Sequence, residues 1–540
     1  MTRASLILLC LTVALIYAAL VLPADPSDLK VSVLRQFPLE LPVLLGCLVA
    51  LGSNRFIAGT VSLLFSFALV ALVLLKLADQ AMITAYQRPF NPIVDMSLIP
   101  AGVALMVQTF GATLAYSLFL GFGCVFLLLF ALVARGLLAW SRLPVKPAVR
   151  SAVALLTIGF VGLVAMDARR QAEELPFVLP GNGHSTWLIQ ERLIMIGETN
   201  THLKAFQALA AADPYADQSN LLNLIGDRDV LFIFIESYGR ASFDQPAYTA
   251  THLPILTNAD AKLRAEGLAM RSGWLTSPTA GGQSWLAHGT LASGLWTEDS
   301  ATYRSMLKSG RKSLFHLAQD AGFRTNAVMP AITMDWPESQ YMGFEQILEA
   351  EHLAYQGPPL NWVTMPDQYT LAAYESLLGP DPRRDFTQIA LISSHAPWTP
   401  ILPILAWDEI EDGSVFDAWA DAGPSPREVW RDRDRVRDHY RQSIAYSLEV
   451  TLDYIAREAH KGRLVFLVGD HQPAEFVAQG KSRDVAIHVI GPPDVMALVD
   501  PWGWSDGLIP DQATPSWRMD RFRDRFIEAF SASDEIKVGG

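Results

Sequence analysis

Three apolar runs in the second half of the chain each end on a side chain that can bind a metal or move a proton. These side chains are Glu236, His395 and the adjacent pair Asp470 and His471. Continuous apolar runs bounded by turn residues are typical of strands buried on both faces of a parallel sheet. Ligands of open α/β sheets bind beyond the carboxyl ends of the strands, so we expect these side chains to meet there. Such a group suits metal-dependent phosphoryl or sulfuryl transfer.

A serine follows a Gly-Gly pair between the first two of these strand ends. Ser284 stands where a helix is expected to begin. A hydroxyl there lies near free N–H groups and the positive end of the helix dipole, which favour an alkoxide and the anion that it attacks. No Gly-x-Ser-x-Gly elbow is present, so we expect metal coordination rather than a hydrolase triad to activate the serine. A plain serine after a glycine turn is the alternative, and Thr279 is a second candidate nucleophile.

Glu236, Ser284, Asp470 and His471 together offer the oxygen and nitrogen donors that suit Mn, Mg or Zn. Each residue also has a structural alternative. Glu236 is suited to capping a helix or forming an ion pair, and the Asp470 segment to an ordinary strand-to-loop turn. The joint occurrence of all four favours a metal site.

Three further histidines are candidates for contact with a substrate. His395 follows its own strand, and a histidine there can exchange protons near neutral pH. His288 lies one helical turn after Ser284 and either touches substrate or packs in the core. His488 belongs to another strand-like run, which predicts either a supporting role near the site or contact with substrate.

The elements that position these residues form an α/β pattern from Asp227 to about Ala532. Ser425-Pro-Arg-Glu428 combines a capping serine, a proline at the first helical position and a capping-box glutamate. Apolar residues recur at nearly four-residue spacing from Val436 to Ile455, and Gly462 follows. We therefore predict one long helix ahead of the strand that ends at Asp470.

Residues 1–168 form a predicted transmembrane domain. Several apolar segments approach the ~20 residues that a bilayer crossing needs, and a cleaved signal peptide explains only the first. The five predicted spans are Leu6–Leu22, Phe37–Gly52, Phe56–Leu77, Thr113–Ala134 and Val153–Met166. Residues 97–110 are predicted to be interfacial or re-entrant. Residues 169–226 form a juxtamembrane helical connector with two amphipathic helices, Trp187–Gly197 and Leu203–Ala212, and residues 227–540 form the exported domain.

Charge and cysteine content set the expected side of the membrane and limit the partners. Arg3, Arg55 and the basic loop Arg135–Arg150 fall on one side, which the positive-inside rule assigns to the cytoplasm. Five spans then export everything after about residue 170. The whole chain has a net charge of −13, and the acidic excess lies in the exported part, which argues against nucleic-acid binding. All three cysteines lie in predicted spans, so no disulfide is expected in the exported part.

The ordered motifs Phe234-Ile-Glu-Ser-Tyr-Gly, Gly282-Gln-Ser, Ser394-His-Ala-Pro-Trp and Gly469-Asp-His resemble those of lipoteichoic acid synthases and membrane phosphoglycerol transferases. These are the sulfatase-like family of the alkaline phosphatase superfamily. The resemblance implies a divalent metal, commonly manganese, held by Glu236, Ser284, Asp470 and His471. It also implies a nucleophilic Ser284 in place of the family's threonine. His395 takes the position of the substrate-binding or acid/base histidine.

The sequence departs from the family pattern at one substrate-binding motif. The family's Trp-x-Arg survives only as Trp336 followed by Pro337-Glu338-Ser339. Type I sulfatases carry a Cys/Ser-x-Pro-x-Arg motif, which is missing here, so formylglycine chemistry is not expected. We predict an α-helical membrane domain with five spans, followed by a sulfatase-like α/β domain with a mainly parallel sheet.

The predicted activity is transfer of a phosphoglycerol-type headgroup from a membrane lipid to an envelope glycan or lipid, with Ser284 as the covalent carrier. The expected location is the bacterial inner membrane, with the catalytic domain on the periplasmic face. A hydrolase of sulfate or phosphate esters is the first alternative, because the same site can use water as acceptor. An inactive membrane-tethered scaffold that binds envelope partners is the second.

Overall fold

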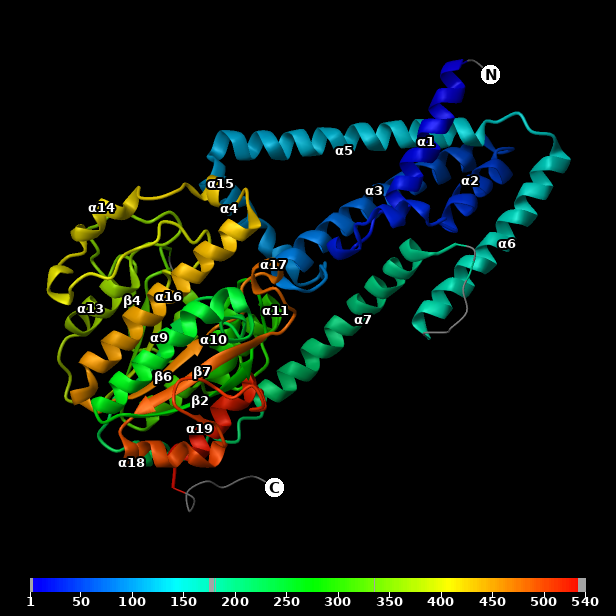
Figure 1. The fold of residues 1–540 in the computed structure, drawn as a ribbon. Coiled ribbons are helices and arrows are strands. Elements are labelled where there is room, and N and C mark those ends of the chain that lie inside the picture. Colours follow the sequence, from blue (N-terminus) through cyan, green and yellow to red (C-terminus); the bar gives the residue numbers. More distant parts are fainter. Residues whose placement is uncertain (1–2, 174–178, 180, 335, 533–540) are drawn as a thin grey trace. The chain divides into compact units, whose positions relative to one another are not determined.

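The structure is a computed structural model that describes residues 3–173, 179, 181–334 and 336–532 (Figure 1). Its internal contacts divide the chain into two compact units, which are described separately. The first unit contains residues 1–84 and 88–202, and the second contains residues 85–87 and 203–540.

The first unit is helical. Four of its helices, α1, α3, α5 and α6, are long and apolar enough to cross a membrane, by length and composition. The helices are α1 (Arg3–Val21), α2 (Glu40–Leu51), α3 (Arg55–Tyr86), α4 (Ile99–Phe110), α5 (Ala112–Ser141), α6 (Pro147–Ala172) and α7 (His184–Ala211). The predicted N-terminal domain of apolar helices is thereby confirmed. Four of its helices reach the length needed to cross a membrane, whereas five spans were predicted.

The predicted second span and the predicted connector differ from the structure. The helical part of the second span is α2, whose 12 residues rise about 18 Å, well short of a hydrocarbon core of ~30 Å. The hydropathy of Phe37–Gly52 was continuous, but the helix begins only at Glu40. In the connector, the two expected helices are one continuous helix, α7, of 28 residues.

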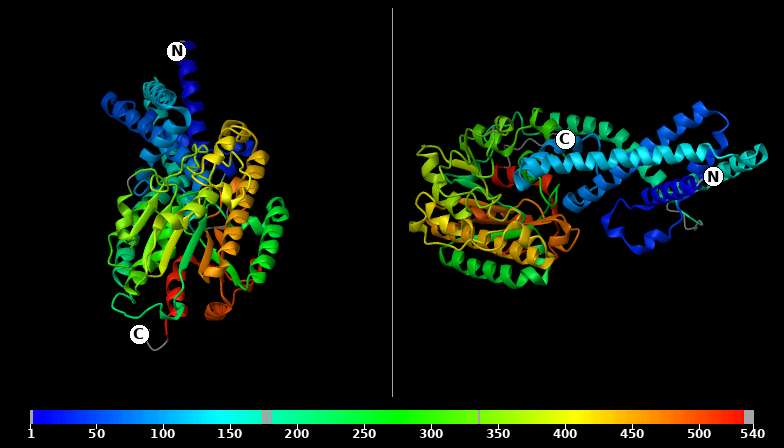
Figure 2. Two further views of the ribbon diagram at one scale, coloured as in Figure 1. Left: turned by 90° about the vertical axis from the view of Figure 1, so that its left-hand side faces the viewer. Right: turned by 90° about the horizontal axis from the view of Figure 1, so that it is seen from above.

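The second unit is built on one nine-stranded sheet, which can be followed in Figure 2. The strand order is β4-β3-β5-β1-β6-β7-β2-β8, and β9 also pairs with β2. Only β7 and the short β8 run against their neighbours, so the prediction of a mainly parallel sheet is confirmed. The strands are β1 (Val230–Ile235), β2 (Ala269–Thr276), β3 (Arg324–Met329), β4 (Gln346–Glu349), β5 (Asp385–Ala390), β6 (Leu464–Gly469), β7 (Asp484–Gly491), β8 (Ser505–Asp506) and β9 (Trp517–Arg518).

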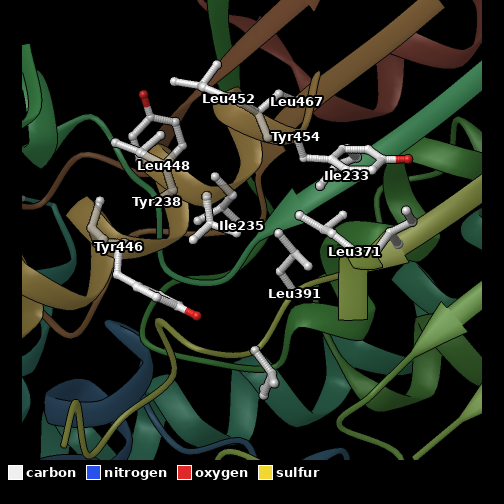
Figure 3. Packing of buried hydrophobic residues seen from close by; sticks show 14 of the residues in the cluster. Ile233, Ile235, Tyr238, Leu371, Leu391, Tyr446, Leu448, Leu452, Tyr454 and Leu467 are labelled. Carbon is white, nitrogen blue, oxygen red and sulfur yellow. The ribbon is translucent and has the colours of Figure 1, made fainter. Parts of the chain in front are cut away.

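Both faces of the sheet are buried, as the apolar runs predicted. Successive residues of β1 alternate between two hydrophobic clusters, with Ile233 and Ile235 in one and Phe232 and Phe234 in the other. Figure 3 shows the first cluster, to which Ile233, Ile235 and Leu448 of α16 belong. Helices α9 (Pro246–Ala265), α13 (Asp367–Leu378) and α16 (Arg433–Arg457) cover this face, and α10 (Ser284–Ser293), α12 (Leu314–Asp320) and α19 (Phe522–Phe530) cover the other.

The predicted long helix is in fact two helices. The Ser425 capping box forms as expected, but it opens only the short helix α15 (Pro426–Val429). Asp432 then accepts hydrogen bonds from the backbone N–H groups of Asp434 and Arg435 and begins α16. The apolar spacing from Val436 onward was correctly assigned to one helix, and the second cap explains why the chain turns before it.

The remaining short helices lie in the connections of the second unit. They are α8 (Ala241–Asp244), α11 (Ser300–Leu307), α14 (Asp417–Ala420), α17 (Glu475–Ala478) and α18 (Pro493–Met496).

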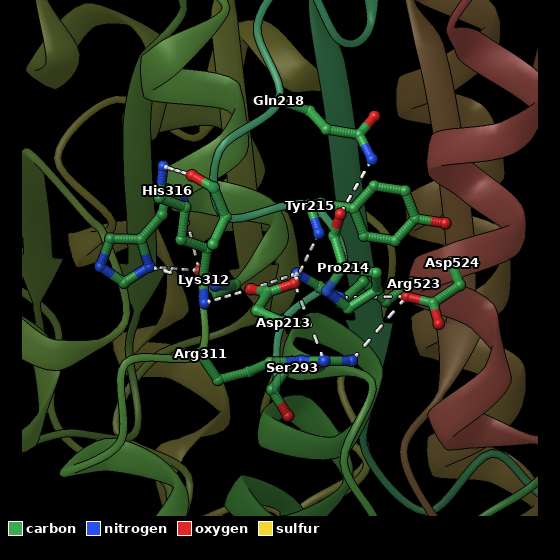
Figure 4. A network of polar contacts seen from close by, with 12 residues as sticks. Asp213, Pro214, Tyr215, Gln218, Ser293, Arg311, Lys312, His316, Arg523 and Asp524 are labelled. Carbon is green, nitrogen blue, oxygen red and sulfur yellow. Dashed lines mark hydrogen bonds and ion pairs between the residues drawn. The ribbon is translucent and has the colours of Figure 1, made fainter. Parts of the chain in front are cut away.

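A buried ion-pair network fixes the end of α10 opposite Ser284 (Figure 4). Arg523 donates to both carboxylate oxygens of Asp213 at 2.8 Å, and Arg311 donates from Nε to the Ser293 carbonyl at 2.9 Å. Burial raises the pKa of Asp213, but the charge and hydrogen bonds of Arg523 outweigh it and hold that pKa below its usual value. The carbonyl end of α10 is therefore anchored by two arginines.

Candidate metal-dependent active site

Two neighbouring parallel strands deliver the acidic residues of the site. β1 and β6 pair in register up to Ile235 and Gly469, so Glu236 and Asp470 leave the sheet side by side. A Cβ at Gly469 would lie 1.8 Å from the carbonyl oxygen of Tyr238, so only glycine lets the chain after β1 approach this closely. The strand ends therefore bring together the residues that the sequence placed there.

Ser284 reaches the same point from the start of α10. In the loop before it, Gly281, Gly282 and Gln283 all have positive φ values, of 74°, 142° and 65°. Glycine adopts such values readily, which explains the Gly-Gly pair at this turn. The Ser284 hydroxyl donates to Glu236 Oε2 at 2.7 Å and lies 3.2 Å from His471 Nε2. The hydroxyl of Thr279 instead donates to the Gly282 carbonyl at 2.7 Å and so stabilises the loop. Of the two candidate nucleophiles, Ser284 is the one that reaches the acidic cluster.

The imidazole of His471 presents its Nε2 atom to the cluster. Its Nδ1 lies 2.9 Å from the Gln472 carbonyl, which only accepts hydrogen bonds, so Nδ1 carries the proton. Nε2 lies 3.1 Å from Glu236 Oε1 and 3.9 Å from Asp470 Oδ2. A neutral histidine fixed in this tautomer has a free Nε2 lone pair, as metal-binding histidines do.

One carboxylate oxygen of Asp470 is held by the backbone. Oδ1 accepts from the N–H groups of Ser237 at 2.8 Å and His471 at 2.6 Å. Oδ2 remains directed toward the His471 side of the cluster. Asp470 and His471 are each 1% exposed, so these bonds are shielded from water.

The cluster contains two acids, Glu236 and Asp470, but its negative charge is balanced only by nearby histidines. Burial raises the pKa of Glu236, but the charge and hydrogen bond of His471 and the charge of His395 lower it well below its usual value. Burial and the negative charge of Glu236 together raise the pKa of Asp470 to about 8. Burial lowers the pKa of His471, but the charges of Asp470 and Glu236 raise it to about 9.

A divalent cation fits this donor set. The ligand atoms of Glu236, Asp470 and His471 all lie within 4.8 Å of one another, and Ser284 adds a hydroxyl oxygen. Two buried carboxylates with no arginine or lysine bonded to them need positive charge, which a bound cation supplies. Oxygen donors with one imidazole suit Mn, Mg or Zn. The structure thus brings together all four predicted ligands.

His395 lies beside the cluster on the loop that follows β5. β5 ends at Ala390, earlier than predicted, and the loop is fixed by side chains instead. The Ser394 hydroxyl donates to the Glu236 carbonyl at 2.7 Å, and Asp367 Oδ1 accepts from the N–H groups of Ile392 and Ser393 at 2.8 Å each. The half-buried ring of His395 lies close enough to Glu236 for its charge to affect that pKa.

Asp367 is a positioning residue that the sequence analysis did not single out. It is fully buried, and its second oxygen accepts from the Ser447 hydroxyl of α16 at 2.6 Å. It thus ties the His395 loop to a core helix. The only signal in the sequence was a Pro-Asp pair at the start of α13, which is common at helix N-termini and points to no particular role.

His288 lies under the cluster, on the next turn of α10 after Ser284. Its ring centroid is 4.1 Å from that of Phe234, and its Nε2 is buried without a hydrogen-bond partner in the described chain. Burial lowers its pKa to about 4, although the charge of Glu236 opposes this. It is 7% exposed, so packing rather than contact with a large substrate describes its position.

The structure does not support His488 as a residue that contacts substrate. It lies in the middle of β7 and is fully buried, with Nε2 3.1 Å from the Tyr238 hydroxyl and Nδ1 2.7 Å from Ser272 Oγ. Both ring nitrogens are therefore occupied inside the fold, and burial lowers its pKa to about 3. β7 is antiparallel, so the strand-like run does not deliver this residue to the carboxyl edge.

Trp336 precedes a short 3-10 helix, Pro337–Tyr341, and its ring packs 6.1 Å from that of Phe344. Among the described residues, its aromatic partner belongs to the neighbouring core rather than to the metal cluster. Contact between Trp336 and a substrate stays a prediction.

Comparisons with known proteins agree with this geometry. Residues 228–483 match the model of the Sulfatase family. This segment begins just before β1 and ends just before β7, so it contains all four candidate metal ligands and His395. A search of curated protein sequences found no match.

Several solved structures are similar to this chain at low identity. The integral membrane lipooligosaccharide phosphoethanolamine transferase A of Neisseria meningitidis aligns over 98% of this chain and 95% of its own, with 13% identity and a TM-score of 0.49. The phosphoglycerol transferase GacH of Streptococcus pyogenes, solved with sn-glycerol-1-phosphate, aligns over 62% and 82%, with 14% identity and a TM-score of 0.37. The zinc complex of the periplasmic domain of EptC from Escherichia coli aligns over 49% and 73%, with 13% identity and a TM-score of 0.33.

The assignment to a family rests on the family match and on the site, because likenesses this distant add no argument of their own. The matched segment carries the ordered motifs, the mainly parallel sheet and the converging acids that the sequence predicted. The predictions of the fold class and of an enzyme of this type are confirmed. Residues 228–483 match a sulfatase domain, and the chain joins this sulfatase-like α/β domain to an N-terminal set of apolar helices.

Proposed function

We propose that this protein is a membrane-anchored, metal-dependent transferase. It moves a phosphoglycerol-type headgroup from a membrane lipid to an envelope glycan or lipid through a covalent Ser284 intermediate. The observation that carries the proposal is the Ser284 hydroxyl, 2.7 Å from Glu236 and 3.2 Å from His471 at the start of α10. The four helices able to cross a membrane place this site in a chain suited to lipid substrates.

Glu236, Ser284, Asp470 and His471 would hold one divalent cation, for which we favour manganese over magnesium or zinc. When bound, the cation would supply positive charge that lowers the pKa of the Ser284 hydroxyl and offsets the charge of the phosphoryl group. The residues of the chain do the rest. Glu236 orients the serine by accepting its hydrogen bond, and the positive amino end of α10 would stabilise the attacked anion.

The proposed reaction has two displacements at phosphorus. Ser284 first releases its hydroxyl proton to solvent. Its alkoxide oxygen then bonds to phosphorus, and the bond to the lipid oxygen breaks as His395 donates a proton to that leaving oxygen. The acceptor hydroxyl next gives its proton to His395 and bonds to phosphorus, and Ser284 leaves as the alkoxide that began the cycle. A histidine suits both halves because its proton affinity is balanced near neutral pH.

We further propose that the protein lies in the bacterial inner membrane with the second unit on the periplasmic side. The support is the basic loop Arg135–Arg150 between α5 and α6, which the positive-inside rule assigns to the cytoplasm. A periplasm-active reporter fused at the C-terminus should be active, and one fused near Pro144 should be silent. The reverse pattern would contradict both the topology and an envelope substrate.

Intact-protein mass spectrometry tests the covalent step directly. The purified protein is incubated with manganese and vesicles of phosphatidylglycerol, and in a parallel sample with vesicles of phosphatidylethanolamine. A headgroup adduct that maps to Ser284 and is discharged by an added glycan or lipid acceptor supports the transferase. An adduct on Thr279 would move the nucleophile there. Discharge by water at the same rate with and without acceptor would make the protein a hydrolase.

A further inference from the structure

A cavity of about 270 Å³ lies inside the first unit, between helices that are long and apolar enough to cross a membrane. It is lined by residues of α1, α2, α3, α6 and α7, and most of the lining side chains are aliphatic or aromatic. Representative residues are Val43, Phe65, Leu72 and Val164. Apolar cavities of roughly 150 Å³ in proteins stay dry and bind small hydrocarbons, and this one is larger.

The packing of α2 against α6 explains why the space exists. At Gly46 an added Cβ would lie 2.1 Å from Thr157 Oγ1, so the two helices touch at that level. Small residues allow such close approach in membrane helices. One turn nearer the start of α2, the facing side chains are Val43 and Val161, and both line the cavity instead of meeting.

A buried ammonium group holds Ser185, one of the polar residues of the cavity lining, in place. Lys76, which is 2% exposed, donates to the carbonyls of Ala19 at 3.1 Å and Leu20 at 2.9 Å and to the Ser185 hydroxyl at 3.0 Å. All three ammonium protons are therefore used within the protein. Ser185 is part of the lining, so this part of the cavity wall is rigid.

The carboxylate of Glu40 lies on the lining in the same region. Its Oε1 accepts from the N–H of Thr186 at 3.0 Å and from its hydroxyl at 3.2 Å. The cavity thus has one polar region and an otherwise apolar wall. That arrangement suits a hydrocarbon chain that enters from a bilayer and lies along the apolar wall.

We propose that this cavity binds one acyl chain of a membrane phospholipid. Three of the surrounding helices, α1, α3 and α6, are long and apolar enough to cross a membrane, so hydrocarbon is the ligand that would reach the cavity. Each methylene that leaves surrounding lipid for this wall gains packing, and the gap would otherwise leave its lining atoms without partners. The cavity lies within the first unit and involves neither Ser284 nor the candidate metal ligands. The proposal can therefore be tested independently of the proposed catalysis.

Photolabelling of the full-length protein tests the proposal. The protein is reconstituted in phosphatidylcholine nanodiscs that contain phosphatidylcholine with a diazirine in the middle of one acyl chain. After illumination, labelled residues are mapped by peptide mass spectrometry. We expect labels on cavity residues such as Val43, Leu72 and Val164. Labels found only on lipid-facing residues such as Leu64 and Leu127 would overturn the proposal.

Two matched substitutions separate cavity occupancy from general lipid contact. Val43→Trp fills the cavity, whereas Val125→Trp makes the same change on α5 at a residue that is 53% exposed. Val43→Trp should lower the cavity labels severalfold, because the larger side chain takes the space that the acyl chain would occupy. Val125→Trp should leave them unchanged. Equal cavity labelling in the two variants would contradict the proposal, and Val43→Phe replaces Val43→Trp if the latter does not fold.

Discussion

The two edges of the central sheet treat acids in opposite ways. At the amino edge, Arg324 forms a two-bond ion pair with the partly buried Asp385 at 2.6 and 2.9 Å, and Arg463 reaches Glu375 of α13 at 2.6 Å. At the carboxyl edge, the buried Glu236 and Asp470 lie together with only an imidazole between them. The acids at the amino edge are therefore neutralised by arginines, and those at the carboxyl edge have no permanent counter-charge among the described residues.

The pKa values express this difference. Burial raises the pKa of Glu375, but hydrogen bonds from Arg463 and Lys461 lower it to about 2. Burial and the charge of Glu236 raise the pKa of Asp470 to about 8. An acid that is costly to ionise in the metal-free protein becomes favourable to ionise when a cation binds beside it. A strongly shifted pKa of this kind is therefore typical of a functional site. The comparison separates acids that hold the fold together from acids kept for a ligand.

The largest effect is expected for the nucleophile. Ser284→Ala should lower turnover by roughly 10³-fold or more, because residues that form a covalent intermediate have effects of this order or larger. The fold should survive, since the Ser284 side chain is only partly buried and contacts the cluster alone. Steady-state kinetics and circular dichroism measure the two quantities. Thr279→Ala is the control, and an inactive Thr279→Ala beside an active Ser284→Ala would reverse the assignment.

A smaller loss is expected at the proton-transferring residue. His395→Ala should slow turnover about 10²–10⁴-fold, the usual contribution of general acid–base catalysis. Metal content, measured by inductively coupled plasma mass spectrometry, should stay normal because the residue lies outside the four-ligand cluster. Loss of metal would make His395 a ligand, and full activity would make its role structural.

The contrast between the two edges is sharpened by the same substitution at each. Asp470→Asn should abolish metal binding with little loss of stability in the metal-free protein, because it removes an acid that is costly to ionise. Asp385→Asn should leave metal content unchanged and destabilise the fold by about 1–3 kcal/mol, since it weakens the pair with the buried Arg324. Denaturant melts in the presence of a chelator give the stabilities. If both variants lose metal, or both lose stability equally, the two edges do not differ as described.

The smallest effect is a pH dependence of stability with opposite sign at the two edges. In metal-free protein, Asp470 and His471 bind protons more tightly folded than unfolded, with pKa values raised to about 8 and about 9. Their stabilisation is therefore lost as pH rises toward 9. Glu375 has a lowered pKa, so its contribution is lost as pH falls from its unfolded value toward about 2.

Thermal melts across pH, with and without manganese, measure both windows. Asp470→Asn should flatten the alkaline side of the metal-free profile, and Glu375→Gln the acidic side. Saturating metal should remove the alkaline loss, because metal binding displaces protons from its ligands. A metal-free protein that gains stability between pH 7 and 9 would contradict the electrostatic description.

The sequence was most informative where burial leaves a simple pattern. The run before Glu236 is apolar at every position because both faces of β1 are covered, so its end could be located. Asp470 could be placed beside it because parallel strands deliver their ends to one edge. The apolar runs alone gave no strand direction, so the sequence did not show that His488 lies in the middle of the antiparallel strand β7.

Other misses have local physical causes. The apolar run Phe37–Gly52 predicted a full membrane span, but α2 has only 12 residues and begins at Glu40. Hydropathy measures composition and does not show at which residue a helix begins. The second helix cap at Asp432 was hidden because the apolar spacing begins only after it. Asp367 acts through backbone groups distant in sequence, and such contacts leave no mark in spacing or composition.

The loop that carries His395 has a consequence for how this enzyme can diversify. Glu236, Asp470 and His471 leave the sheet directly at strand ends, so any insertion near them would shift the metal ligands. The His395 loop instead leaves the sheet at Ala390, and the Asp367 side chain holds it at Ile392 and Ser393. Loops on a rigid scaffold tolerate changes in length. Under the proposed function, selection for a new acceptor can therefore remodel the segment after His395 while the candidate metal ligands keep their positions.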